Sequence, residues 1–162
     1  GNNCYNASWS GGCLTDIIPT TKNGNQILNE TILPTTPNVL LFMYGTNDYG
    51  KGVSSEVFNQ SLETFVQTAR NKWSGVIIYV CSYPFNKRMY DGVVVNTENV
   101  TTWSEAVENK AKELGCKTID ILNVGNNSDN WNLFNIGDGV HYNAKGAKLI
   151  KNNVIQQVAE FN

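Results

Sequence analysis

One segment limits the choice of fold more than any other. Residues 38–44 (NVLLFMY) are almost all apolar, and they lead directly into Gly45-Thr46-Asn47-Asp48. A strand that is buried on both faces of a parallel sheet has this continuous apolar character. We therefore predict an α/β domain in which residues 38–44 form a buried strand. The polar residues after it then lie at the carboxyl end of the strand, where such folds bind their ligands.

Strand-like and helix-like segments alternate along the rest of the chain. The other predicted strands are residues 4–9, 75–82 and 116–122. Apolar residues at three- and four-residue spacing predict helices over residues 55–73, 101–114 and 144–161, and Thr101 or Thr102 is the expected cap of the second helix. In the last helix Ala147, Ile150, Val154, Val158 and Phe161 are expected to face inward. This alternation predicts a single domain over residues 1–162, a three-layer α/β/α sandwich with a mostly parallel, flavodoxin-like sheet.

Composition and charge exclude several classes of protein. Hydrophobic residues make up 41% of the chain and charged residues 16%, which is typical of a globular protein rather than a disordered one. The net charge is −2 and no basic stripe occurs, so we expect no nucleic-acid partner. No apolar run approaches the roughly 18 residues of a membrane-spanning helix, so we expect no membrane partner. With one histidine and no Cys-x-x-Cys pair, we expect no metal and no cofactor.

The four cysteines lie in two kinds of sequence environment. Cys81 and Cys116 lie in apolar, strand-like runs and are predicted to be buried thiols. The spacing of Cys4 and Cys13 is compatible with a disulfide across a short loop and equally with free thiols.

Residues 138–141, Asp138-Gly139-Val140-His141, contain the elements of general-base catalysis. Histidine is the usual base at neutral pH, and it needs a carboxylate that fixes its tautomer. An aspartate three residues earlier, in a turn that contains glycine, can fold back to serve this purpose. Such a segment also occurs as a plain surface turn, but its position just before the terminal helix favours the catalytic interpretation.

Two further segments can supply hydrogen-bond donors to a developing negative charge. Asn47 follows a predicted strand and can direct its amide at an oxyanion, while Gly45 lets the backbone turn tightly. Asp48 is expected to support this turn by hydrogen bonds to loop backbone. Ser10-Gly11-Gly12 offers backbone N–H groups of the same kind. A simple turn remains the alternative for both segments.

Together these segments resemble the SGNH hydrolase family, also called GDSL esterases. That family has its motifs in a fixed order: Gly-Asp-Ser with the nucleophile, an oxyanion glycine, Gly-x-Asn-Asp, and Asp-x-x-His. The resemblance implies that His141 is the base and Asp138 its orienting carboxylate, and that Gly11 and Asn47 form the oxyanion hole. Gly45 and Asp48 would have supporting roles. It also implies a serine esterase that acts on small acyl esters without a cofactor.

The chain departs from the family in one respect, because no Gly-Asp-Ser occurs in it. Nothing in the sequence places Ser8, Ser10 or Ser82 on a nucleophile turn, although each is a possible substitute. We therefore expect an N-terminally truncated domain that lacks its central strand and its nucleophile and is inactive alone. The missing strand would come from another peptide or from a swapped neighbour.

Polar and aromatic loops without a long apolar lid favour short-chain substrates such as acetylated carbohydrates. The alternative is a non-catalytic glycan-binding module in which Trp9, Tyr49, Tyr90 and Trp131 stack on sugars. A nucleotide-binding domain is not favoured, since no glycine-rich phosphate loop is present. For location we expect a secreted or cell-surface protein of a bacterium.

Overall fold

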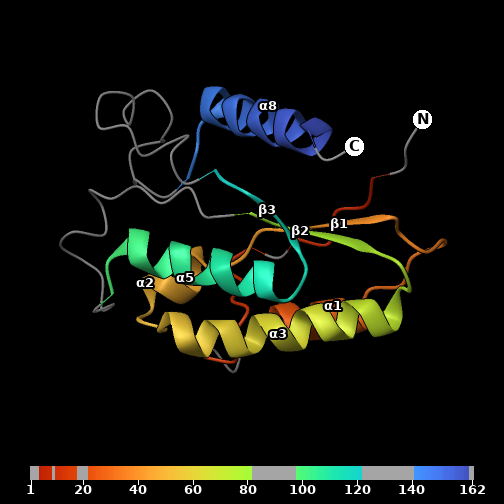
Figure 1. The fold of residues 1–162 in the computed structure, drawn as a ribbon, viewed down its shortest axis with the longest axis horizontal. Helices are drawn as coiled ribbons and strands as arrows, with labels where there is room; N and C mark the ends of the chain where they lie inside the picture. Colours follow the sequence, from red (N-terminus) through yellow and green to blue (C-terminus); the bar gives the residue numbers. More distant parts are fainter. Residues whose placement is uncertain (1–3, 9, 18–21, 82–97, 122–140, 161–162) are drawn as a thin grey trace.

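The computed structural model describes residues 4–8, 10–17, 22–81, 98–121 and 141–160 (Figure 1). Three parallel strands form one sheet in the order β1 (Val39–Phe42), β2 (Ile77–Cys81) and β3 (Lys117–Ile119). Val39 pairs with Ile77, and Tyr79 pairs with Lys117. The helices α1 (Gly24–Glu30), α3 (Ser55–Lys72) and α5 (Val100–Glu113) lie on one face of the sheet, and α8 (Ala144–Glu160) lies on the other. The predicted three-layer α/β fold with a parallel sheet is confirmed.

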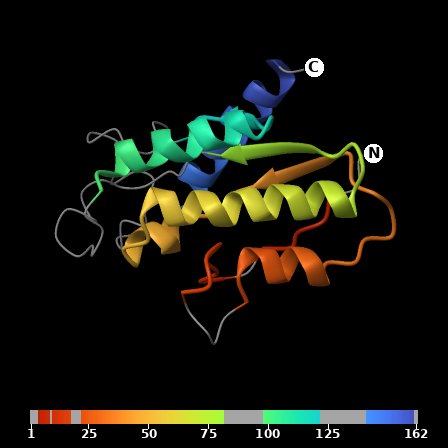
Figure 2. The ribbon, with the colours of Figure 1, turned by 60° about the horizontal axis from the view of Figure 1, so that its bottom comes forward.

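The larger core lies between the sheet and the helices α1, α3 and α5, and Figure 2 shows how these helices are arranged beside the strands. Trp103 is fully buried there, packs against the rings of Tyr49 and Phe58, and donates its indole N–H to the Val53 carbonyl at 3.0 Å. Helix α3 contributes the apolar stripe that its spacing predicts: Phe58, Leu62, Phe65, Val66 and Ala69. This core fixes β1 and the turn after it from one side.

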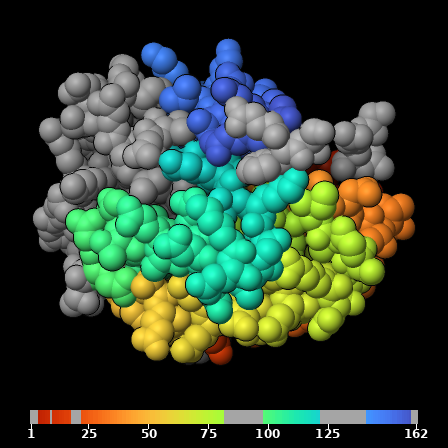
Figure 3. Space-filling view, in the orientation of Figure 1, coloured from red at the N-terminus to blue at the C-terminus, as the bar shows by residue number. Residues whose placement is uncertain are grey.

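A smaller core lies between the sheet and α8, the blue helix at the top of the space-filling view in Figure 3. Tyr79, Cys81, Ile119 and Ile121 are buried there against Ile150, Val154 and Val158 of the helix. Ala147 is exposed, contrary to the prediction, and Gly146 is buried instead, while Phe161 lies outside the described residues.

The cysteines are free thiols in this structure. Cys81 and Cys116 are buried as predicted, and burial raises the pKa of the Cys81 thiol to about 12. Cys4 is exposed and Cys13 is buried, and no disulfide joins them. Of the two alternatives that their spacing allows, the structure therefore shows free thiols.

The residues that begin the helices differ in part from those expected. Ser54 precedes α3, and its hydroxyl accepts a hydrogen bond from the Val57 amide at 3.3 Å, as an N-cap does. Helix α5 begins at Val100, and its cap is Asn99 rather than Thr101 or Thr102. The Asn99 side chain accepts from the Thr101 amide at 2.9 Å, because it is one residue ahead of the unpaired donors of the first turn.

Two sequence predictions about strands are wrong. Residues 4–8 form no strand and are exposed, because no described strand pairs with them, and Trp9 lies outside the described residues. The strand β1 is not buried on both faces: Leu40 and Phe42 face the larger core, whereas Val39, Leu41 and Met43 are exposed.

No helix in the described part of the chain is both long and apolar enough to cross a membrane.

Lys72 connects the end of α3 to the end of α1. Its ammonium group donates to the carbonyls of Leu28 and Asn29, at 2.8 and 2.7 Å. These carbonyls belong to the last turn of α1, where the helix itself provides no donor. Lys72 therefore acts as a C-terminal cap that is supplied by another helix.

Replacing Lys72 by methionine is expected to lower the free energy of unfolding by about 1 kcal/mol, because two charge-assisted hydrogen bonds are lost at an exposed site. Urea denaturation followed by circular dichroism measures the change. Lys148→Met, at an exposed position of α8, is the matched control and should leave the stability unchanged. Equal effects of the two substitutions would contradict a capping role.

Candidate active site

The candidate site begins at the carboxyl end of β1. Gly45 has φ of +118°, a left-handed conformation that favours glycine, and it precedes the short helix α2 (Thr46–Gly50). This turn places Asn47 and Asp48 in the first turn of α2. The sequence did not predict α2, because five residues are too few to show helical periodicity.

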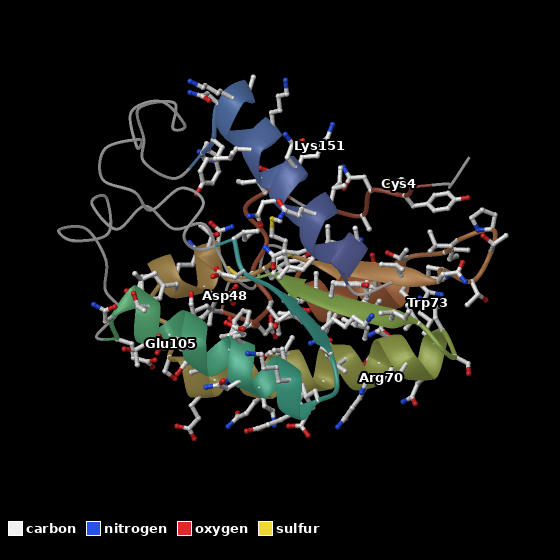
Figure 4. All side chains as sticks on the ribbon, turned by 45° about the horizontal axis from the view of Figure 1, so that its top comes forward. Cys4, Asp48, Arg70, Trp73, Glu105 and Lys151 are labelled. Carbon is white, nitrogen blue, oxygen red and sulfur yellow. The ribbon has the colours of Figure 1, made fainter. Side chains whose placement is uncertain are left out.

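Asp48 holds a loop that is distant in sequence. Its carboxylate is fully buried and accepts hydrogen bonds from the Leu14 amide, the Thr15 amide and the Thr15 hydroxyl, at 2.9, 2.9 and 2.5 Å. Figure 4 labels Asp48 near α2, to the left of the strands. These bonds include two to loop backbone, as expected for this residue. Asp48 thereby fixes the loop that follows Gly11.

Neighbouring groups fix the remainder of this loop. The side-chain amide of Asn47 donates to the Gly12 carbonyl at 3.0 Å, and the Gly24 amide of α1 donates to the Cys13 carbonyl at 2.9 Å. Residues 12–15 are therefore each held by at least one hydrogen bond. Gly11, just before them, is exposed and has φ of +72°, so it too needs the conformational freedom of glycine. The structure thus brings Asn47 next to the glycine turn, as the motif order implied.

The buried surroundings of this loop disfavour ionisation of the Cys13 thiol and of the neighbouring Tyr44 phenol. Burial, and secondly the charge of Asp48, raises the pKa of the Cys13 thiol to about 11. Burial and then the same charge raise the pKa of Tyr44, whose hydroxyl has no hydrogen-bond partner among the described residues. Cys13 is therefore protonated near neutral pH and is a poor candidate for a substitute nucleophile.

The structure describes only one of the two remaining catalytic candidates. His141 is exposed and lies three residues before α8, whereas Asp138 lies outside the described residues. Figure 1 shows α2 and the beginning of α8 at the same end of the sheet, where the parallel strands have their carboxyl ends. No group of three or more His, Cys, Asp or Glu side chains within the described residues is placed to bind a metal ion.

The aromatic residues proposed for sugar stacking receive no support from the described structure. Tyr49 is buried, and its hydroxyl donates to the Glu98 carbonyl at 2.7 Å, so the expectation that it is an exposed loop aromatic is wrong. It lies in α2 and packs on Trp103, which gives it a structural role. Trp9, Tyr90 and Trp131 lie outside the described residues.

Comparison with known proteins decides the family. The chain matches the GDSL-like Lipase/Acylhydrolase family over residues 2–149. The chain belongs to this family. A GDSL esterase/lipase of Arabidopsis thaliana, CPRD49, is 28% identical over 76 residues, which are 46% of this chain and 30% of that protein. The chain therefore matches less than a third of the length of this curated relative.

Solved structures of other proteins share the fold of this family member. A peptidoglycan O-acetylesterase aligns with a TM-score of 0.67 and 18% identity, over 86% of this chain and 41% of that one. A carbohydrate acetylesterase family member from Sinorhizobium meliloti aligns with a TM-score of 0.68 and 20% identity, over 91% of this chain and 74% of that one.

Sequence reasoning missed three residues that support the GDSL-like site and that lie far from Asn47 and Asp48 in the sequence. No local sequence pattern marks Leu14 or Thr15, because their hydrogen bonds to Asp48 join residues that are more than thirty positions apart. Gly24 was also missed: a Cβ there would lie 2.9 Å from Leu14 Cδ1, so glycine lets α1 pack closely on the loop. The closeness of α1 to the glycine turn could be found only from the structure.

Proposed function

We propose that this chain forms most of a serine esterase that hydrolyses small acyl esters, with acetylated carbohydrates as the preferred class. The observation that carries the proposal is the hydrogen-bonded arrangement of Asn47 and the loop after Gly11 at the carboxyl end of β1. Family membership supports the same reaction type. The nucleophile is a serine of a Gly-Asp-Ser block that residues 1–162 do not contain, so the chain alone is inactive.

The oxyanion hole of the proposed reaction consists of two donors. Asn47 uses one hydrogen of its amide on Gly12, and its other hydrogen makes no hydrogen bond within the described residues. The Gly11 amide is likewise without an acceptor in the described part of the chain. Donors that are fixed before the reaction stabilise a tetrahedral oxyanion strongly, because they need not reorganise when the charge develops.

The remaining steps follow the serine–histidine–aspartate scheme. The serine oxygen attacks the ester carbonyl carbon while His141 accepts the serine proton, and Asp138 stabilises the imidazolium. The protonated His141 then donates this proton to the departing alcohol, and an acyl-enzyme remains. Water, deprotonated by His141, attacks the acyl carbon, and return of the proton to the serine oxygen releases the carboxylic acid.

The proposed substrate class draws on similar proteins. Two of the similar structures carry the names peptidoglycan O-acetylesterase and carbohydrate acetylesterase family member. We propose acetyl esters of a polysaccharide for this protein too, and a secreted or cell-surface location in a bacterium, where such polymers are accessible. Rates on acetyl and octanoyl esters test the class, and a preference for the octanoyl ester would contradict it.

The assays need a completed form of the protein. We define it as residues 1–162 with a strand–helix polypeptide that contains Gly-Asp-Ser fused ahead of Gly1. Hydrolysis of para-nitrophenyl acetate by the completed form, and none by residues 1–162 alone, is the expected result. Equal rates for the two forms would contradict the proposed nucleophile.

Replacing Asn47 by alanine in the completed form is expected to lower kcat by about 10²–10³-fold, the usual effect of removing one oxyanion donor. The KM for the acetyl ester should change little, because the donor acts mainly in the transition state. Asn152→Ala, at an exposed position of α8, is the control and should retain full activity. A raised KM with an unchanged kcat would indicate that Asn47 only binds substrate.

A further inference from the structure

An exposed cation lies one helical turn after the proposed oxyanion donor Asn47. The Lys51 amide donates to the carbonyls of Asn47 and Asp48, at 3.1 and 3.2 Å. Residues four positions apart lie on the same face of a helix, with about 5–6 Å between their Cβ atoms. Asp48 and Tyr49 form the buried side of α2, whereas Asn47 is half-buried and Lys51 is exposed. Lys51 therefore lies on the same side of α2 as Asn47.

No acidic side chain neutralises Lys51. Within the part of the chain that the structure describes, no carboxylate is at ion-pair distance from its ammonium group. Asp48, the acidic residue nearest in sequence, uses its carboxylate on the donors of Leu14 and Thr15. Asp16 is exposed and likewise makes no ion pair with any described residue. The ammonium group of Lys51 is therefore free to pair with an anion from outside the chain.

The charge of Lys51 also acts on the loop that contains the other oxyanion donor, Gly11. Burial, and then the charge of Asp48, raise the pKa of the Cys13 thiol, whereas the charge of Lys51 lowers it. Charges at a protein surface are largely screened beyond about 10 Å, so the ammonium group lies near this loop. Cys13 is two residues after Gly11. An ester whose carbonyl oxygen lies between Gly11 and Asn47 therefore has Lys51 close to its substituents.

We propose that Lys51 is a specificity-determining residue that binds an anionic group, a carboxylate or a phosphate, on the alcohol part of the ester. The proposal rests on the proposed function and narrows its substrate class to acetyl esters of acidic polysaccharides. The acetyl group is uncharged, so only the alcohol part can carry the anion. A lysine ammonium is a compact charge on a flexible stem, and it can follow an anion whose position varies along a polymer.

Two small acetyl esters separate charge recognition from catalysis in the completed form. 4-Acetoxybenzoate carries a carboxylate, and its methyl ester is neutral with the same acetyl–phenol linkage. Lys51→Gln removes the charge and Lys51→Arg keeps it. Lys151→Gln is the matched control, because Lys151 is an exposed lysine of α8, on the other face of the sheet (Figure 4). For each protein, kcat/KM for the acid is divided by kcat/KM for the methyl ester, which cancels their different reactivities.

We expect Lys51→Gln to lower this ratio about threefold to fivefold at low salt, which is the effect of losing one exposed charge pair. The change should appear in KM, because the anion is bound equally in the ground state and the transition state. Lys51→Arg and Lys151→Gln should keep the ratio, and about 0.5 M NaCl should remove the effect of Lys51→Gln. An unchanged ratio at low salt would overturn the proposal. An equal loss on both esters would also overturn it, since Lys51 would then act on the oxyanion.

Polymeric substrates identify the source of the anion. Acetate release is measured from acetylated polygalacturonate, which carries carboxylates, and from an acetylated polyol phosphate. The polymer on which Lys51→Gln causes the larger loss contains the anion that the site prefers. No loss on either polymer would contradict the proposal.

A binding measurement on residues 1–162 tests the site without catalysis. Trigalacturonate, titrated at low salt and followed by NMR, should bind Lys51→Gln about threefold more weakly than the unchanged chain, while Lys151→Gln should bind it normally. If the completed form hydrolyses neither small ester and this difference is still seen, the anion site stands and the proposed function fails. If both esters are hydrolysed and Lys51→Gln changes neither binding nor the ratio, the proposed function stands and the anion site fails.

Discussion

Replacing His141 by alanine is expected to lower kcat of the completed form by about 10⁴-fold or more. Without the imidazole, no group at the site takes the serine proton during attack or returns it to the leaving alcohol. The loss should exceed that of Asn47→Ala, because the base takes part in both acylation and deacylation. Para-nitrophenyl acetate hydrolysis measures the rate directly.

The control for this substitution is chosen from the same segment. Lys145 is exposed and lies four residues further along, in the first turn of α8, so Lys145→Ala should leave kcat unchanged. Because His141 is the only histidine in the chain, no second imidazole within it can replace the lost one. An unchanged circular dichroism spectrum would show that the His141→Ala protein is folded. If this folded protein keeps the original rate, the proposed mechanism is ruled out.

Replacing Asp48 by asparagine is expected to lower the free energy of unfolding by about 2–4 kcal/mol, because buried donors lose an ionised acceptor and an unsatisfied buried donor costs about 1–3 kcal/mol. Asparagine keeps one acceptor oxygen, but its NH₂ group then faces a backbone N–H that also donates. The three hydrogen bonds from Leu14 and Thr15 cannot all be kept. Urea denaturation of residues 1–162 at neutral pH measures this loss.

Two variants test whether the effect arises from these contacts. Asp16→Asn changes a neighbouring aspartate that is exposed, and it should alter the stability by less than about 0.5 kcal/mol. Thr15→Val removes one of the three donors and should cost about 1 kcal/mol. If Asp48→Asn is no more destabilising than Asp16→Asn, the buried carboxylate does not hold the loop as described.

Much of the fold could be predicted because its signals are local. The stripe of α3, the apolar run of β1 and the glycine before α2 each follow from a few consecutive residues. Burial of β1 on both faces was wrong for a physical reason: an apolar run reports that a strand is covered, and not which polypeptide covers it. Val39 and Leu41 therefore have the sequence of an interior strand and an exposed position in this structure.

Only those residues of the candidate site that lie in short sequence motifs could be predicted. Gly11, Asn47 and Asp48 were found from short segments, and the structure brings Asn47 and Asp48 against the loop after Gly11. The partners Leu14 and Thr15 have no distinctive pattern, since an ordinary leucine and threonine gain their roles from a contact between distant parts of the chain. Residues 4–9 were expected to be a strand from composition alone, and for residues 4–8 strand pairing, which is nonlocal, decided otherwise.

The hydrogen bonds that connect Asp48 with Leu14 and Thr15, and Asn47 with Gly12, determine when this part of the domain becomes ordered during folding. They join backbone segments that are 33 to 35 residues apart, so neither segment is ordered until the chain between them has folded. The entropy of aligning the two donor groups is therefore lost during folding and not in each encounter with an ester. A local opening of either segment should release both donors together, so the site closes and opens as one cooperative unit.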